Sequence, residues 1–242
     1  METKTLNAIR AHAIRAYPLE SCGLVVVARG REQYVECSNA ATGGDHFVLP
    51  AQEFADAEDR GAVVAVVHSH PDAPAAASEA DQAACEASGI AWHIVEVRRD
   101  DSGAVLVGDL VTIEPCGFQV PLVGRSFAHG VLDCYTLVRD WWRTERGVVL
   151  RDFARRDEWW WQGGDLYMQH YRDAGFEPVV DGAELQRGDV ILMQVRADVP
   201  NHAGVYLGDG TMLHHLYGRL SSRDPYGGYW REITRLVVRY ER

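Results

Sequence analysis

The chain has 242 residues, of which 47% are hydrophobic and 24% charged, so it can bury a core in one large domain or in two ordinary ones. Its net charge of -11 argues against nucleic acid as a default partner, and no apolar run is long enough to span a membrane. The amino terminus does not resemble a signal peptide, and the five cysteines form no CxxC pair. We therefore expect free thiols in a protein made in a cytoplasm.

Charge and tryptophan are distributed unevenly along the chain. There are 8 basic and 18 acidic residues up to Pro115, but 16 and 17 after it, and six of the seven tryptophans lie in this second part. Proline and glycine residues punctuate the sequence between Gly108 and Gly124, which is typical of a linker. We expect one domain over residues 1–112, a linker at 113–122 and a second domain over 123–242.

The first half alternates helix and strand signals, which predicts an α/β sandwich around a central sheet. The apolar run that begins at Ala62 is typical of a strand buried on both faces, and Gly89 is a typical helix stop. The expected helices cover residues 5–17, 50–60 and 78–88, and the expected strands cover 23–28, 62–69 and 91–97.

The second half places helices before a run of strands, which predicts an α+β domain with an antiparallel sheet. A cluster of three tryptophans at 159–161 lies between the two helices. The expected helices cover residues 133–143 and 165–174, and the expected strands cover 189–195, 202–207, 211–216 and 233–240.

His68 and His70 lie two residues apart where an expected strand ends, so strand geometry puts both imidazoles on one face. Asp81 follows a loop containing Pro71 and Pro74, and the chain can fold back there to offer a third ligand. Imidazole and carboxylate are ligands that zinc takes in catalytic sites, with one position left for water. Such a site also needs a general base, for which a carboxylate is typical.

Ser78 and Asp81 have an alternative interpretation as a helix capping box, in which they do no more than begin a helix. An isolated His-x-His pair is also a loose motif that is common in ordinary surface and core positions. The combination of these residues, rather than any one of them, favours a metal site.

Glu20, His68-x-His70, Ser78 and Asp81 together resemble the motif of the JAMM (MPN/Mov34) metalloproteases, and the letters PLESCG around Glu20 resemble that family's first-strand motif. The resemblance covers about residues 1–110 and implies a cytidine-deaminase-like α/β sandwich. It implies zinc held by His68, His70 and Asp81. It also implies that Glu20 is the acid/base acting on the bound water and that Ser78 stabilises the tetrahedral oxyanion.

Cys134 follows Asp133 at the expected start of a helix, where the partial positive charge of the helix N-terminus favours a thiolate. A thiolate nucleophile pairs with an imidazole, and His202 opens an expected strand. A lone cysteine on a helix is more often a small buried apolar residue. As with the metal motif, the combination is what favours the functional interpretation.

The register of two strands decides which histidine lies beside His202. A two-residue turn at Asp209-Gly210 puts His215 on the same face, whereas a three-residue loop that includes Gly208 puts His214 there. The residues alone leave both alternatives open.

The segments LDCYTLV, RGDV and HAGVYLGDGTMLH resemble the NlpC/P60 cysteine peptidases over about residues 120–240. The resemblance implies a papain-like α+β domain with Cys134 as nucleophile, His202 as general base and a third polar residue that orients the imidazole. The family's usual spacing selects His214 for that third role. Many members carry a tyrosine twelve residues before the cysteine, where this chain has Leu122. That departure leaves open what stabilises the oxyanion, although backbone N–H groups could do so.

A JAMM-like domain in front of an NlpC/P60-like domain resembles the tail assembly protein K family of lambdoid phages. The resemblance implies two hydrolase sites, one cutting the peptide stems of peptidoglycan during infection and one, zinc-dependent, trimming a tail protein. It implies tail-tip proteins as partners, and a location in the host cytoplasm during assembly and then at the virion tail tip. The alternatives are a structural tip component or assembly factor with one or both sites inactive, and, less favoured, a cellular ubiquitin-like isopeptidase.

Overall fold

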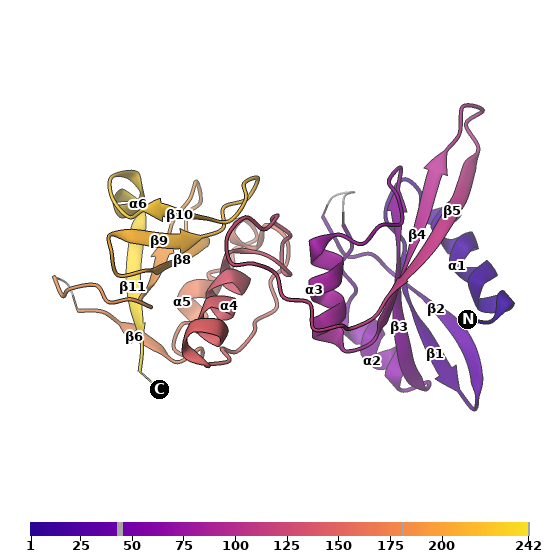
Figure 1. Ribbon diagram of the computed structural model, residues 1–242, viewed down its shortest axis with the longest axis horizontal. Helices are drawn as coiled ribbons and strands as arrows, with labels where there is room; N and C mark the ends of the chain where they lie inside the picture. Colours follow the sequence, from indigo (N-terminus) through magenta and orange to yellow (C-terminus); the bar gives the residue numbers. More distant parts are fainter. Residues whose placement is uncertain (43–45, 181, 242) are drawn as a thin grey trace. The chain divides into compact units, whose positions relative to one another are not determined.

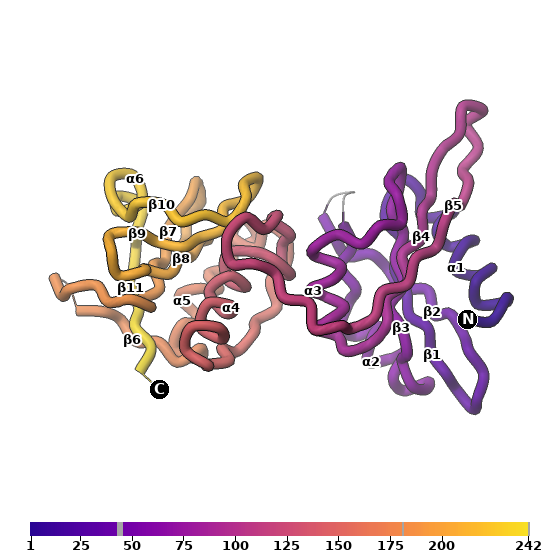
Figure 2. The backbone as a smooth tube through the Cα atoms, viewed as in Figure 1, coloured from indigo at the N-terminus to yellow at the C-terminus, as the bar shows by residue number. Residues whose placement is uncertain are grey.

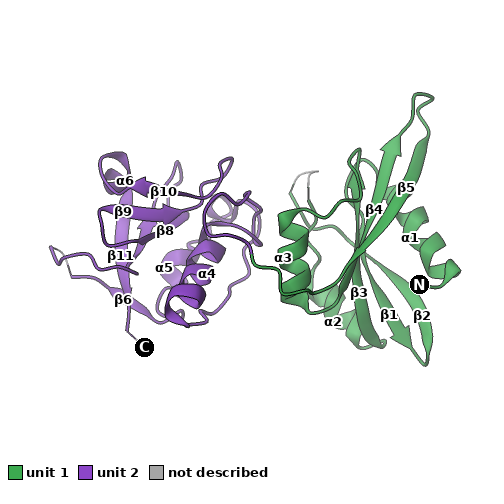
Figure 3. Cartoon of the chain, in the orientation of Figure 1, with its two compact units in different colours: residues 1–119 green, residues 120–242 purple. Residues whose placement is uncertain are grey.

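The computed structural model describes residues 1–42, 46–180 and 182–241. The chain divides into two compact units, residues 1–119 and 120–242, which Figure 3 colours separately. This division lies inside the segment 113–122, which was expected to be a linker. None of the helices in the described ranges combines the length and apolar character needed to cross a bilayer.

The first unit is a five-stranded sheet with helices on both of its faces (Figure 1). Its elements are α1 (Thr3–Ala16), β1 (Cys22–Ala28), β2 (Arg31–Cys37), α2 (Ala51–Glu58), β3 (Ala62–Pro71), α3 (Glu79–Ser88), β4 (Ala91–Arg99) and β5 (Val105–Ile113). The strand order is β2-β1-β3-β4-β5. Only β3 and β4 among these neighbours pair parallel, as expected for strands joined by a helix.

Side chains alternate along β3 between two apolar clusters. Val67 packs with Ile9 of α1 in one cluster, and Val66 packs with Cys85 of α3 in the other. Because successive side chains of a strand point to opposite faces, the even-numbered residues at the end of β3 lie on the side covered by α3.

The edge strands β2 and β5 are the elements of this unit that the sequence did not predict. Both are largely exposed or half-buried, so they lack the continuous apolar run that marks β3. Gly108 lies within β5 although glycine was interpreted there as linker punctuation. A Cβ at this position would lie 2.7 Å from the Glu96 carboxylate, so the glycine makes room for a neighbouring side chain.

The second unit is a six-stranded antiparallel sheet with α4 lying against one face, as the traced backbone in Figure 2 shows. Its elements are α4 (Cys134–Arg146), the 3-10 helix η1 (Trp159–Trp161), α5 (Leu166–His170), β6 (Phe176–Pro178), β7 (Val190–Met193), β8 (His202–Tyr206), β9 (Thr211–His214), β10 (Ser222–Pro225), α6 (Tyr229–Glu232) and β11 (Thr234–Tyr240). The strand order is β10-β9-β8-β7-β11-β6. Val138 and Trp141 of α4 pack on Leu192 and Val205 of the sheet. This arrangement confirms the expected two-part α+β fold.

One prediction for this unit was wrong in detail, and a strand that bears on the site was not predicted. The helix expected over 165–174 ends at His170, and the chain continues as turns into Gly175, whose φ of 95° is left-handed. The sequence also gave no sign of β10, because Ser-Arg-Asp-Pro has the composition of a turn. This strand matters because it carries Asp224.

Candidate functional sites

Glu20 lies two residues before β1, where that strand pairs antiparallel with the end of β3. The pairing extends one residue beyond the strand, because Ser69 N–H donates to the Ser21 carbonyl at 3.1 Å and Ser69 Oγ accepts from Ser21 N–H at 2.9 Å. This places Glu20, which is only 9% exposed, beside His70.

Three side chains from β3 and α3 converge on one point. His68 Nε2 lies 3.0 Å from His70 Nε2 and 3.2 Å from Asp81 Oδ1, and His70 Nε2 lies 3.6 Å from Asp81 Oδ2. The candidate ligand atoms all lie within 4.8 Å of one another. The structure therefore brings together the three residues predicted as metal ligands.

The surroundings of the two imidazoles fix how they face the cluster. His70 Nδ1 lies 2.9 Å from the Pro74 carbonyl, which can only accept, so Nδ1 carries the proton and Nε2 offers its lone pair. Phe47 stacks on His68 with ring centroids 4.8 Å apart, and Trp92 meets His68 edge-on at 5.6 Å. The Nε2 atoms of both imidazoles therefore face the cluster, and each can bind a metal ion once it carries no proton.

The capping box is also present. Asp81 N–H donates to Ser78 Oγ at 3.1 Å, and Ser78 N–H and Oγ–H both donate to Asp81 Oδ2 at 2.7 Å. Asp81 Oδ1 is left directed at His68. One carboxylate thus begins α3 and completes the cluster, so the two interpretations are compatible.

The pKa values of the three candidate ligands are shifted in different directions. Burial lowers the pKa of His68, which keeps it neutral. Burial also lowers the pKa of His70, but Asp81, the Pro74 carbonyl and Glu20 outweigh this and raise it. Burial raises the pKa of Asp81, yet the two imidazoles hold it well below its usual range. Once His70 has released its proton, as metal binding requires, the two nitrogens and the ionised carboxylate form a donor set that could bind a metal and that fits zinc in particular.

In the second unit, Asp133 fixes the start of α4. Its Oδ1 accepts from Thr136 N–H at 2.8 Å, and its Oδ2 accepts from Gly130 N–H at 3.0 Å and from Arg155 Nε at 2.7 Å. Both members of the ion pair are buried, with 3% and 7% of their side chains exposed. The carboxylate therefore sets the position of Cys134, the first residue of the helix.

The thiol of Cys134 contacts the Tyr167 hydroxyl, with Sγ and Oη 3.1 Å apart, and the backbone at Ala203. Burial, followed by the charge of Asp133, raises the pKa of Cys134 to about 11. The expectation that the helix N-terminus would favour a thiolate was wrong for this resting structure, because desolvation outweighs the helix dipole.

The hairpin between β8 and β9 has the three-residue loop. Leu207 N–H donates to the Thr211 carbonyl at 2.9 Å, and Gly204 pairs with His214. The even-numbered residues of the two strands thus share one face, and His202 and His214 lie side by side on it.

His202, His214 and Asp224 form a chain of hydrogen bonds. His202 Nε2 lies 2.9 Å from His214 Nδ1, and His214 Nε2 lies 3.1 Å from Asp224 Oδ2. Burial raises the pKa of Asp224, but His214 outweighs it and lowers the pKa, so the carboxylate is ionised and can only accept. His214 Nε2 and His202 Nε2 are therefore the protonated nitrogens, and His202 Nδ1 is free to accept a proton.

His202 is neutral in the structure, as a general base has to be. Burial holds its pKa well below the usual range, and the neighbouring His214 and His215 add to the effect. Within the described residues no hydrogen bond joins Cys134 to His202 itself; the contact is with the backbone of Ala203. Catalytic hydrogen bonds are commonly long in structures without substrate.

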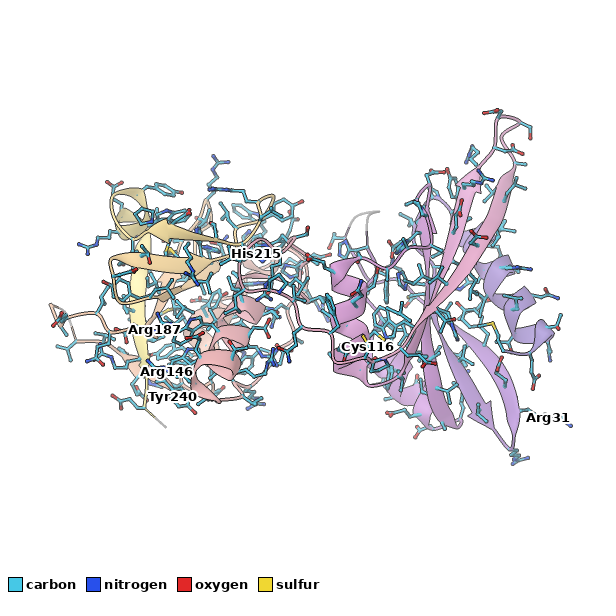
Figure 4. The ribbon with its side chains drawn as sticks, in the orientation of Figure 1. Arg31, Cys116, Arg146, Arg187, His215 and Tyr240 are labelled. Carbon is cyan, nitrogen blue, oxygen red and sulfur yellow. The ribbon has the colours of Figure 1, made fainter. Side chains whose placement is uncertain are left out.

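His215 lies outside this chain of hydrogen bonds, beside the loop that precedes α4 (Figure 4). The ring of Phe127 meets it edge-on at 5.0 Å. The His215 ring is buried, and its polar contact is with the backbone of Arg219. Asp224, by contrast, was missed by sequence reasoning and lies within the site.

Known proteins match the chain along its whole length. Family profiles match residues 2–107 as prokaryotic homologs of the JAB domain and residues 124–239 as the NlpC/P60 family. Tail tip assembly protein K of Escherichia phage N15 is 44% identical, covering 100% of this chain and 96% of that protein. Its counterpart in Escherichia phage lambda is 37% identical, covering 79% of this chain and 89% of that protein.

A solved structure from Salinibacter ruber is 27% identical and covers 46% of this chain and 78% of that one, but its TM-score of 0.32 is too low to support an inference. The two relatives, by contrast, cover both units. The chain belongs to the tail tip assembly protein K family, with a JAB-like N-terminal domain and an NlpC/P60 C-terminal domain.

Proposed function

We propose that the chain is a phage tail-tip assembly protein with two hydrolase sites. The NlpC/P60 domain cleaves the peptide stems of peptidoglycan during infection, and the JAB-like domain is a zinc-dependent peptidase or isopeptidase that trims a tail protein. The names of the two relatives and the two domain families support this proposal. The protein works with other tail-tip proteins, first in the host cytoplasm during assembly and then at the virion tail tip.

The observation that carries the cysteine-peptidase proposal is the hydrogen-bond chain from His202 to Asp224. Neutral His202 takes the thiol proton at Nδ1 as Cys134 Sγ attacks the peptide carbonyl. His214 and ionised Asp224 stabilise the imidazolium that forms. His202 then gives the proton to the leaving amine, and water hydrolyses the acyl-enzyme.

The convergent cluster of the first unit supports the metallopeptidase proposal. His68, His70 and Asp81 would hold zinc, which supplies a Lewis acid and lowers the pKa of bound water to about 7. Glu20 takes up and returns a proton as general acid and base. Ser78 donates to Asp81 at rest, so its hydroxyl must rotate toward the substrate to stabilise an oxyanion.

Cell-wall digestion tests the cysteine site. Purified full-length protein should release peptides from purified peptidoglycan, as identified by mass spectrometry, and Cys134→Ala should reduce release to background. Cys116→Ala is the matched control, because Cys116 is an exposed free thiol outside the site and its loss should change nothing. Equal release by the wild type and Cys134→Ala would contradict the proposal.

A Glu20→Gln phage tests the metal site. The variant should retain bound zinc, because the predicted ligands are intact, yet should fail to form tails or leave a tail protein uncleaved. Glu58→Gln, on the exposed surface of α2, is the control and should behave like the wild type. Normal tails with normal processing from Glu20→Gln would rule out an essential peptidase role.

The raised pKa of Cys134 favours the alternative of a structural tip component with inactive sites. Alkylation of Cys134 by iodoacetamide distinguishes an active cysteine peptidase from a structural component. A reactive thiol should be alkylated faster as the pH rises toward the pKa of about 11. No labelling at any pH, together with no bound zinc, would favour the structural role.

A further inference from the structure

Tyr167 of α5 places its hydroxyl at the thiol of Cys134, with Oη and Sγ 3.1 Å apart. The ring is fixed by edge contacts with Tyr135, at 6.2 Å between centroids, and with Trp159, at 6.1 Å. A held ring fixes the position of the hydroxyl oxygen, while the O–H bond can still rotate. The oxygen therefore faces the atom at which a covalent bond to substrate would form.

The segment before Cys134 does not supply such a group. Leu122 has no polar side-chain atom and packs against the apolar core of the second unit. The ring of Phe127 packs edge-on against His215 at 5.0 Å and against Tyr217 at 5.4 Å. Neither residue offers a hydrogen-bond donor. Tyr167, which follows Cys134 in the sequence, does offer one.

We propose that the Tyr167 hydroxyl and the Cys134 backbone N–H form the oxyanion hole of the cysteine site. The inference rests on the proposed peptidase function. The reacting carbonyl lies about 3 Å from both the nucleophile and the oxyanion donors in such sites, so a donor beside Sγ is within reach of the new oxyanion. The first N–H groups of a helix have no partner inside it, which makes the Cys134 N–H a second donor.

The reaction step balances without a proton from Tyr167. The Sγ–C bond forms as the carbonyl π pair moves to oxygen, and the thiol proton passes to His202. Tyr167 turns its O–H from Sγ to the oxyanion. When the carbonyl re-forms, the C–N bond breaks and His202 protonates the leaving amine, so Tyr167 is unchanged throughout.

The environment of Tyr167 suits a donor. Burial, to which the charge of Asp133 adds, raises its pKa well above the usual range, so the hydroxyl keeps its proton. The ring lines a crevice whose other walls are largely apolar, among them Tyr135 and Leu166. A hydrogen bond to a developing negative charge is stronger where water is excluded.

The test compares Tyr167→Phe with Tyr171→Phe in the full-length protein. Tyr171 borders the same crevice and is the matched loss of a hydroxyl that has no contact with the thiol among the described residues. Tyr167→Phe should lower kcat for a stem peptide by about a hundredfold to a thousandfold, with KM nearly unchanged. The same variant should bind a reversible peptide aldehyde inhibitor more weakly by a similar factor. The aldehyde forms a hemithioacetal with Cys134, and the oxygen of this adduct lies in the same oxyanion hole.

Alkylation by iodoacetamide forms no oxyanion, so its limiting rate at high pH should be the same in the wild type and both variants. Unchanged turnover and unchanged aldehyde affinity in Tyr167→Phe would overturn the inference while leaving the peptidase proposal intact. An equal loss in alkylation would also overturn it, because Tyr167 would then act on the thiol alone. A wild type that neither cleaves the peptide nor binds the aldehyde at Cys134 would overturn both proposals.

Discussion

The two candidate sites are assembled in different ways. The cluster of the first unit takes its three donors from residues 68–81, where one strand ends and one helix begins. The site of the second unit draws on a helix start and on three strands between residues 134 and 224. The first therefore depends on a local turn and its cap, whereas the second depends on strand register across a sheet.

Their charges differ as well. The first cluster holds an ionised Asp81, two imidazoles whose Nε2 atoms converge, and Glu20 close by. The second rests with a protonated thiol and a neutral His202. The first is suited to holding a cation, and the second is suited to moving a proton only when substrate arrives. The substitutions below test whether this contrast holds.

The largest expected effect is the loss of metal from Asp81→Asn. Asparagine keeps an oxygen that can accept from Ser78 N–H, so α3 should still begin in place. Without the carboxylate charge, the amount of bound zinc should fall to background, as measured by elemental mass spectrometry. Asp59→Asn, at the end of α2, is the control and should bind normally. Cell-wall digestion should not change, and full zinc content in Asp81→Asn would contradict the assigned ligand set.

Asp133→Asn should strongly destabilise the second unit. It leaves the buried Arg155 guanidinium without its buried partner, although Asp152 still bonds Nη1 at 2.8 Å. Breaking a buried pair costs about 3 kcal/mol or more of unfolding free energy. Guanidinium titration followed by tryptophan fluorescence measures this. Asp173→Asn removes an exposed pair with His170 and should cost at most about 1 kcal/mol.

The same ion pair predicts how the stability of the second unit changes with pH. Arg155 helps to hold the pKa of Asp133 below its usual value in the folded chain. A carboxyl whose pKa is lower in the folded chain than in the unfolded chain stabilises the fold. This stabilisation is fully present above the unfolded pKa of about 4, and it is lost as the pH falls toward the folded pKa. Wild-type stability should therefore fall in acid more steeply than that of Asp133→Asn. Parallel profiles would show that Asp133 does not contribute.

Asp224→Asn tests whether the relay of the second unit ends at this carboxylate. A hydrogen bond to a charged group contributes about 1.5–3 kcal/mol, which corresponds to about a tenfold to a hundredfold loss in turnover of stem peptides. Asp209→Asn, in the exposed hairpin loop, should have no such effect. Unchanged turnover in Asp224→Asn would mean that His214 alone orients His202.

The contrast between the sites also explains what the sequence could predict. His68, His70, Ser78 and Asp81 were recognisable because their spacing is local, whereas only the resemblance to the NlpC/P60 family selected His214 over His215. Asp224 was not recognisable, because Ser-Arg-Asp-Pro becomes a strand only by pairing with β9. Tyr167 lies on a helix of five residues, and no local pattern indicates that it meets Cys134. The thiol pKa depends on burial, which the sequence does not specify.

The smallest expected effect, from Ser78→Ala, tests how closely cap and cluster are linked. Loss of the side-chain cap should lower the unfolding free energy of the first unit by about 1 kcal/mol. Because the same hydroxyl orients the Asp81 carboxylate, zinc affinity should fall by about tenfold or more. Ser102→Ala, in an exposed turn, is the control for both measurements. If stability falls while zinc affinity does not, the cap does not position the ligand, and the first site is less local than its sequence suggests.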